Sequence, residues 1–588
     1  MDTFNYETCG GNSAFHNFVN DFADITDPLE RRARALEKID NAKFSWYHVR
    51  AIMVAGVGFL TDAYDIFTID MALSMITNYY YNDYPNKKLR VMPSSTETLL
   101  KVSTPIGTVI GEVLFGILAD LLGRKYMYGI ELMIMIGATI LQCTAGESGA
   151  INFVAVFAFY RIIMGIGIGG DYPLSSIISA EFATTKWRGA IMGAVFANQG
   201  WGQLLAGIVA LIIIVSYKGK INAPDGSCDL DCALANDTMW RILIGFGAVP
   251  GCFALYFRLT IPESPRYTFD VSKELEKATA DALKYVSGDH GEAEIGDIEY
   301  LQSTQGLERI ASIEVPPLIE RPDSKFADFV LHFSQWKHLK YLIGTAGSWF
   351  MLDVAYYGLG LNLPNILHTI GFEVTSSSES DSISVYKELY NEAAGNLLLI
   401  CAGSIPGYWT SVATLDWLGR KPIQIMGFFI TTALLCIIGF GFNKINERGK
   451  VALYVLCQYF LNFGPNTTTF IVPGECFPTR FRSTTHGISA ASGKIGAVIA
   501  QTCIGTLQNH NCPIDPVTGK GDHCWLNNVM KIFALFMLLG LFFSFLIPET
   551  KRKTLEQLNE ELHGEVDISR NHISYKEMPD INTEDSPA

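Results

Sequence analysis

Long apolar stretches recur along the whole chain and are separated by polar segments. Windows of about 19 residues, roughly the length of helix that crosses a bilayer, predict twelve membrane spans. These lie at 48–76, 97–121, 126–145, 152–177, 189–216, 239–260, 338–366, 393–415, 422–442, 450–473, 484–507 and 526–547. The pattern predicts an all-α membrane protein with twelve transmembrane helices in two six-helix halves.

The polar segments define the expected organisation around these halves. It consists of an N-terminal segment 1–47, a first half 48–260, a central loop 261–337, a second half 338–547 and a tail 548–588.

The second half repeats the first at an offset of 291 to 296 residues. The matching residues are Asp120 with Asp416, Gly123 with Gly419, Arg124 with Arg420, Glu181 with Glu475, and Arg188 with Arg482. Repetition in register predicts two structurally equivalent halves related by an axis along the membrane normal. In such an arrangement, equivalent residues face each other across a central cavity.

Charge and cysteine content indicate which partners the chain can have and which side of the membrane its loops occupy. Of its 588 residues, 49% are hydrophobic, and the net charge of −15 argues against a nucleic-acid partner. The basic turns at 123–125 and 419–421 indicate that both termini are cytoplasmic, where the tails and the central loop could meet regulators. Cys228, Cys232, Cys512 and Cys524 lie in two loops on the opposite side, so one or two disulfides are expected there.

Five ionisable residues lie deep inside predicted spans. They are Asp62, Asp65, Asp171, Asp353 and Lys494. Because such groups are costly in a bilayer, they mark a functional site by default. The alternative for any one of them is an ion pair that only holds two helices together, and this alternative is favoured for Glu112, Glu131 and Arg161.

The repeat groups these residues with several neutral donors. Asp62 and Asp353 are equivalent at an offset of 291, and at 294 Tyr172 falls on Asn466 and Lys494 falls beside Gln199. Trp349, Asp353 and Tyr357 are spaced four apart and therefore share one helical stripe. We expect all of these residues to converge on a polar ligand, with N–H and O–H groups beside carboxylates.

A glycine pattern in the fourth span does not indicate a nucleotide site. Gly165, Gly167 and Gly170 have the spacing of a dinucleotide fingerprint, but they lie within a membrane span and not between a strand and a helix. Small residues there favour close helix packing. No metal-ligand cluster or nucleophile with its base occurs at a recognisable spacing, so the sequence predicts neither a cofactor nor an enzyme.

The motifs resemble known transporter families. The paired Asp-x-x-Gly-Arg-Lys turns and the ends at 262–266 and 548–550 resemble the major facilitator superfamily. The segments 169–175, 56–67, 347–358 and 462–470 are similar to the phosphate:proton symporters of fungi and plants, and the likeness runs from about residue 15 to 560. This resemblance implies proton-coupled import of inorganic phosphate through the plasma membrane.

The resemblance also implies roles for individual residues. Phosphate would be surrounded by Tyr172, Gln199, Trp349, Asp353, Tyr357 and Asn466, with Lys494 nearby, while Asp62, Asp65 and Asp171 would lie on the proton route. An ionised Asp353 would repel dihydrogen phosphate, so we expect it to bind the anion when protonated. The alternatives are a sugar or organic-acid symporter, and a phosphate receptor that signals with or without transport.

Overall fold

The computed structural model describes most of both halves and parts of the connecting segments. The described residues are 40–41, 44, 46–83, 88–89, 92–222, 228–259, 325–363, 366–367, 384–504, 507, 512 and 525–564. Most of the predicted central loop, the first 39 residues and the tail beyond 564 lie outside them.

The first half consists of six long helical rods. They are α2 (Trp46–Tyr80), α3 (Ser94–Leu122), α4 (Arg124–Cys143), α5 (Phe153–Phe182), α6 (Arg188–Ser216) and the pair α8 (Leu230–Gly245) and α9 (Ala248–Leu259). Two short strands, β1 (Asn82–Asp83) and β2 (Lys88–Leu89), pair in antiparallel fashion after α2. A one-turn helix α7 (Lys218–Ile221) follows α6.

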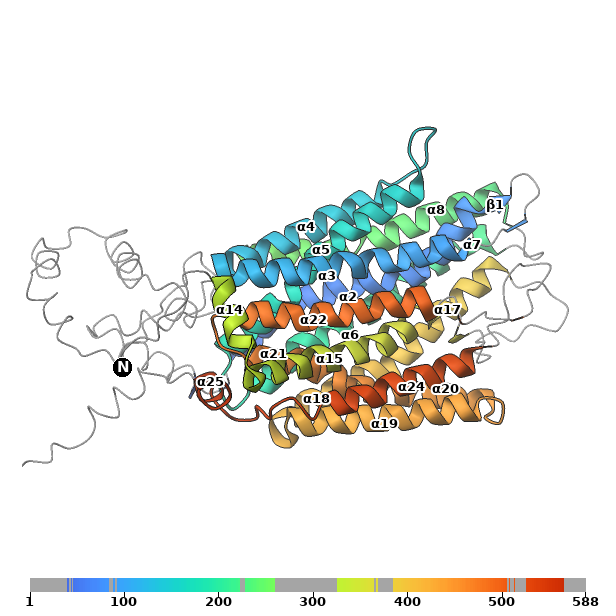
Figure 1. The fold of residues 1–588 in the computed structure, drawn as a ribbon. Helices are drawn as coiled ribbons and strands as arrows, with labels where there is room; N and C mark the ends of the chain where they lie inside the picture. Colours follow the sequence, from blue (N-terminus) through green and yellow to red (C-terminus); the bar gives the residue numbers. More distant parts are fainter. Residues whose placement is uncertain are drawn as a thin grey trace, which may run out of the picture.

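The second half has the same plan, with three helices that contain π-helical segments. It comprises α15 (Trp336–Gly360), α17 (Val385–Leu399) with η2 (Ile400–Ser404) and α18 (Ile405–Leu418), α19 (Arg420–Gly441), α20 (Glu447–Leu461) with η3 (Asn462–Asn466) and α21 (Thr467–Cys476), α22 (Arg482–Ile499) with η4 (Ala500–Ile504), and α24 (Leu526–Phe543). Two short helices, α14 (Lys325–Phe333) and α25 (Leu555–His563), flank this half at one end of the molecule (Figure 1).

Each of the twelve predicted spans coincides with one of these rods, which confirms the fold class. The sixth rod differs most, because α8 begins at Leu230 and not near residue 239. Within the described residues, nine rods are long and apolar enough to cross a membrane. The other three, α15, α20–η3–α21 and α22–η4, are more polar, and they carry Asp353, Asn466 and Lys494 respectively.

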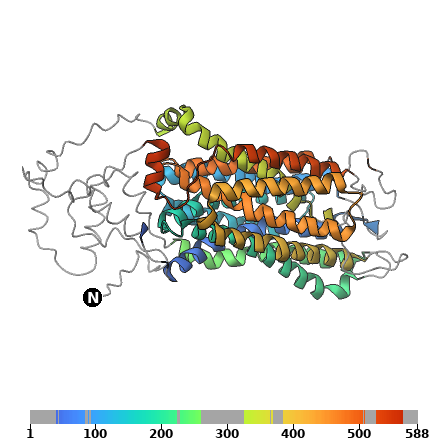
Figure 2. The same ribbon diagram turned by 90° about the horizontal axis from the view of Figure 1, so that it is seen from below.

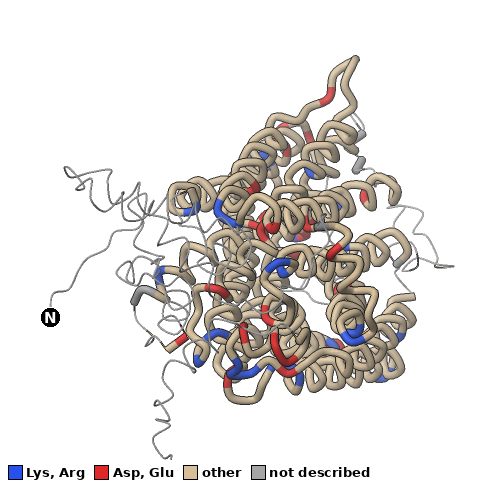
Figure 3. Tube along the Cα trace, turned by 60° about the vertical axis from the view of Figure 1, so that its left-hand side comes forward, with Lys and Arg blue, Asp and Glu red and all other residues tan. Residues whose placement is uncertain are grey.

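The two halves lie side by side with their helices running in the same general direction (Figures 1 and 2). Across the boundary, α3 packs along α22, and α6 packs along α17 and α18. Charged positions occur within the bundle as well as at its ends (Figure 3). The disulfide between Cys228 and Cys232 closes the start of α8, and Cys512 is also disulfide-bonded.

The repeated basic turns lie together at one end of the bundle, which we call the basic-turn end. Gly123 and Gly419 adopt φ of 105° and 103°, a conformation that glycine reaches without strain. Each turn therefore reverses the chain directly between two long helices. The aspartate before each turn caps a helix of the other half: Asp120 accepts a hydrogen bond from Thr484 N at 2.7 Å, and Asp416 accepts one from Ala190 N at 2.9 Å.

Buried ion pairs join the halves at this same end. Glu475 contacts Arg188 of the other half and Arg420 of its own half, at 2.8 Å each. The equivalent Glu181 contacts Arg482 across the boundary at 3.1 Å. The residues that reveal the repeat in the sequence thus close the basic-turn end, and we call these contacts the basic-turn gate.

Candidate functional site

A buried ion pair lies at the boundary between the halves, inside the rods α15 and α22–η4. Lys494 Nζ on α22 lies 2.9 Å from Asp353 Oδ2 on α15, and both side chains are almost completely buried. Gly493 permits this approach, because a Cβ atom there would lie 2.6 Å from Trp349 and 2.8 Å from Asp353 Oδ2. A desolvated pair of this kind is weak evidence for stability and stronger evidence for a site.

Three aromatic rings surround the ammonium group. Lys494 Nζ lies 4.6 Å from the ring centre of Tyr172, 4.8 Å from Tyr357 and 5.9 Å from Trp349. Tyr172 belongs to α5 in the first half, whereas the other two rings belong to α15. The predicted stripe on α15 therefore faces Lys494, with both of its rings within range of a cation–π interaction.

A break in one helix presents Asn466 to the same region. Within η3 the backbone departs from helical geometry at Phe463 and Gly464, next to Pro465. Proline removes a backbone donor, which is a usual cause of such a kink. The carbonyl of Asn462 is satisfied instead by hydroxyl groups of Ser411 at 3.0 Å and Thr467 at 2.8 Å. Gly427 on α19 leaves room for this irregular segment.

Neutral polar groups connect Asn466 with the first half. Asn466 Nδ2 donates to Tyr408 Oη at 2.8 Å, and Tyr408 Oη donates to Gln199 Oε1 at 3.4 Å. Gln199 Nε2 in turn donates to Tyr172 Oη at 3.1 Å. The chain of bonds brings together the four helices α18, η3, α6 and α5. We call the residues Lys494, Asp353, Trp349, Tyr357, Tyr172, Gln199, Tyr408 and Asn466 the central site.

A second group of charges lies within the first half. Arg258 on α9 contacts Asp171 at 2.9 Å and Glu131 at 2.8 Å. Ser175 also donates to Asp171 at 2.5 Å. Asp171 is adjacent to Tyr172 in sequence, so this group, which we call the arginine cluster, adjoins the central site.

Asp62 and Asp65 lie in different surroundings on α2. Asp62 is buried near Asp171 and Arg258, and among the described residues its carboxylate oxygens have no hydrogen-bond partner. Asp65 accepts a hydrogen bond from Thr139 at 3.0 Å and packs against Gly247, inside the first half. Asp62 and Asp353 thus occupy equivalent helices, but only Asp353 has a direct contact with Lys494.

The structure brings together the seven predicted ligand-site residues, and Asp353 is the only predicted proton-coupling residue among them. Tyr172, Gln199, Trp349, Asp353, Tyr357, Asn466 and Lys494 all belong to the central site. Asp171 and Asp62 belong to or border the arginine cluster, and Asp65 lies beyond it. Glu131 and Arg161 make structural contacts, Arg161 through a hydrogen bond to the carbonyl of Leu100 at 3.2 Å.

The sequence favoured a structural ion pair for Glu112, and it did not single out Asp70 or Tyr408. Glu112 is buried in α3, close enough to Lys494 and Asp353 for their charges to act on it. Within the described part of the chain its carboxylate has no hydrogen-bond partner. Asp70 lines a small cavity with Phe67, Gly360 and Glu392, nearer the opposite end of α2. Asp70 is also an intramembrane carboxylate, so the rule that selected Asp62 could have found it. Tyr408 carries no such signal.

Comparison with known proteins agrees with the class that the fold and the buried charges define, a polytopic membrane transporter. The superposition with the proton:xylose symporter XylE, a major facilitator superfamily protein, has a TM-score of 0.63 at 18% sequence identity and covers 88% of this chain and all of that one. The family model described as "Sugar (and other) transporter" matches residues 51–330 and 397–562. The chain belongs to this transporter family, and its fold is that of the major facilitator protein XylE.

Two fungal relatives match over nearly the whole chain. The inorganic phosphate transporter PHO84 of Saccharomyces cerevisiae is 60% identical, over 95% of this chain and 92% of its own length. The repressible high-affinity phosphate permease of Neurospora crassa is 50% identical, over 96% of this chain and 94% of its own length. These relatives are named as a transporter and a permease, which confirms the expectation of a transporter and not an enzyme.

Proposed function

We propose that this protein imports inorganic phosphate together with protons, by alternating access of the central site to the two sides of the membrane. The observation that carries the proposal is Lys494, a buried cation among aromatic and amide donors at the boundary between the halves. Dihydrogen phosphate offers acceptor oxygens to such donors and a charge opposite to that of lysine. The names of the two fungal relatives support the same substrate.

The Lys494–Asp353 pair supports the coupling of phosphate to a proton. Without a ligand the pair carries no net charge, since the ammonium and the carboxylate balance. If phosphate enters as a monoanion and Asp353 takes a proton, the site is again neutral, and Lys494 pairs with the anion. Either event alone leaves an uncompensated charge in a medium of low dielectric constant. The two ligands therefore favour each other's binding.

The arginine cluster supports a proton route through the first half. Asp171 is held by Arg258 beside Tyr172, and Asp62 lies close by with a carboxylate that has no hydrogen-bond partner among the described residues. We assign proton transfer to Asp62, Asp65 and Asp171, and phosphate contact to the central site. Asp353 takes part in both.

Contacts between the two halves close the central site toward both ends of the bundle. Toward the basic-turn end, Phe196 and Phe470 stack with ring centres 4.4 Å apart, and the basic-turn gate lies beyond them. Toward the opposite end, Phe67 stacks on Tyr357 with ring centres 6.1 Å apart. Alternating access would open these contacts in turn as the halves rock about the site. We assign this gate and both termini to the cytoplasmic side of the plasma membrane, an assignment that the basic turns support.

Uptake into proteoliposomes tests the proposal. With an imposed proton gradient, acidic outside, radiolabelled phosphate should accumulate, and dissipating the gradient with an uncoupler should abolish accumulation. Excess unlabelled phosphate should compete, whereas hexoses should not. Competition by hexoses would favour the sugar symporter, and phosphate binding without any uptake would favour a receptor.

A further inference from the structure

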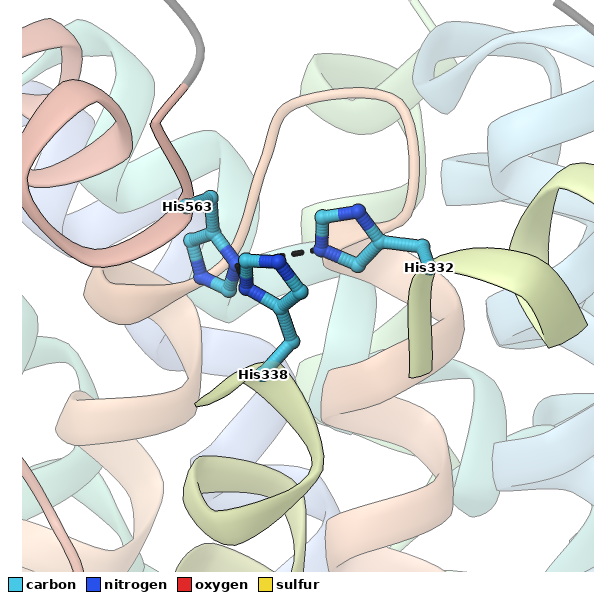
Figure 4. A group of neighbouring side chains, drawn as sticks. All are labelled: His332, His338 and His563. Carbon is cyan, nitrogen blue, oxygen red and sulfur yellow. Dashed lines mark hydrogen bonds between the residues drawn. The ribbon is translucent and has the colours of Figure 1, made fainter. Parts of the chain in front are cut away.

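Three buried histidine side chains meet at the basic-turn end (Figure 4). His332 lies on α14, His338 in the first turn of α15, and His563 is the last residue of α25. One ring nitrogen from each lies within 4.8 Å of those from the other two. The sequence shows no metal-ligand cluster at a recognisable spacing, because these histidines come from dispersed segments.

The hydrogen bonds show which nitrogen of His563 presents a lone pair. Its Nε2 lies 2.9 Å from the carbonyl oxygen of Cys476, which can only accept, so Nε2 carries the proton. Nδ1 of the neutral ring is then an acceptor. Nε2 of His332 approaches it at 3.0 Å, and Nδ1 of His338 approaches it at 3.1 Å. A backbone carbonyl bound to the far nitrogen is the usual arrangement of an imidazole that holds a metal.

We propose that His332, His338 and His563 form a binding site for Zn²⁺. Neutral imidazole is a preferred ligand of this ion, and all three rings are buried, where the neutral form is favoured. An ion among the three nitrogens replaces the contacts between rings by three bonds to the metal. The protons on His332 Nε2 and His338 Nδ1 move to the other nitrogen of each ring.

Zinc binding requires a local rearrangement around His332. The rings of His332 and His338 are stacked with centres 4.2 Å apart and must splay to aim both lone pairs at one ion. Nδ1 of His332, which accepts from Arg480 at 3.3 Å, becomes a donor. Arg480 then turns from His332 toward Asp328, which it already contacts at 3.3 Å.

Because of the position of the site, bound zinc links the tail to the second half at the basic-turn end. It joins α25 in the tail to the helices that begin the second half. The residues just before α25 also contact the basic-turn gate: Arg188 donates to the carbonyl of Lys553, and Thr550 donates to Glu475 at 2.5 Å. A bound ion therefore fastens the tail against the closed gate. This inference does not depend on the identity of the transported substrate.

Zinc titration of the full-length, tag-free protein in detergent tests the proposal, with a chromophoric chelator as competitor. We expect one tight site per chain, and we expect His332→Ala, His338→Ala and His563→Ala each to weaken binding at least about tenfold. His48→Ala removes another buried histidine, on α2, and should bind as the wild type does. If the wild-type protein binds zinc no more tightly than the triple histidine variant, the proposal is wrong.

A second measurement does not depend on the variants folding well. Zinc should raise the melting temperature of the wild-type protein and protect 555–563 against proteolysis. Co²⁺ in place of zinc should give the visible absorption of nitrogen coordination. A wild-type protein that shows none of these responses would overturn the assignment without reference to any substitution.

Discussion

The space around Asp353 is so tight that a side chain one methylene group longer should abolish phosphate binding. Its Oδ2 contacts Lys494 and lies 2.8 Å from the position of a Cβ atom on Gly493. Asp353→Asn keeps the size and a donor but cannot exchange a proton. It should bind phosphate without the roughly 5–150-fold pH dependence expected from coupling, and it should fail in uphill uptake.

The matched control for Asp353→Asn is Asp353→Glu, which keeps the charge and should lose binding because the pocket lacks room. Phosphate binding measured across a pH series with the purified variants distinguishes the two. Unchanged pH dependence in Asp353→Asn would remove Asp353 from the proton-linked role and leave Asp62 as the candidate.

Lys494 should be needed both for the anion and for its carboxylate partner. Lys494→Ala leaves Asp353 buried without its cation, and truncating one member of such a pair costs about 2–5 kcal/mol. Phosphate affinity and melting temperature should both fall. Asp353→Asn added to Lys494→Ala should restore the melting temperature, since no charge remains unpaired, but should not restore phosphate affinity. A Lys494→Ala protein with normal affinity would exclude this residue from the site.

Lys494→Arg tests the shape of the cationic group at the same position. The guanidinium is planar and wider than the ammonium, which lies among the rings of Tyr172, Tyr357 and Trp349. Rescue should be incomplete, with phosphate affinity below that of the wild type. Full rescue would mean that charge alone matters there.

At the scale of elements, α2 approaches the arginine cluster only because residue 58 has no side chain. A Cβ atom on Gly58 would lie 1.6 Å from Arg258 and 2.1 Å from Asp171. Gly58→Ala should displace this ion pair, lower stability by about 1–3 kcal/mol and impair proton-driven uptake. Gly137→Ala on α4 is the control, because no atom lies within 4 Å of its Cβ position. Equal melting temperatures and uptake in the two variants would contradict the argument.

The elements also show what the sequence could predict about the site. Internal repetition predicted that Tyr172, Asn466 and Gln199 converge, and helical spacing predicted that Trp349 and Tyr357 flank Asp353. Both predictions depend on the spacing of residues along the sequence, and regular helices keep this spacing in the folded protein. Tyr408 and Arg258 were not predicted as site residues, because their roles depend on how separate helices pack. The break at η3 also had only a local signal, the Gly464–Pro465 sequence.

At the scale of the whole molecule, the repeat explains both the fold and the gate. The number of spans followed from apolar length, although three rods of the second half are less apolar than the other nine. These three rods carry Asp353, Asn466 and Lys494 of the central site. The repeated Glu and Asp residues, together with Arg188 and Arg482, contact the opposite half, so the repeat in the sequence corresponds to two equivalent sets of contacts at the basic-turn end.

Glu475 should hold the halves together at that end, because its carboxylate joins Arg188 of the first half to Arg420 of the second. Glu475→Gln should shift the population toward a state open at the basic-turn end. The neighbouring Cys476, a free and buried thiol, should then react faster with a membrane-impermeant thiol reagent, as measured by mass spectrometry. Glu549→Gln is the control, because Glu549 binds the backbone of Arg420 and Lys421 within one half. If Cys476 stays protected in Glu475→Gln, or becomes equally reactive in Glu549→Gln, the ion pairs do not govern opening of the gate.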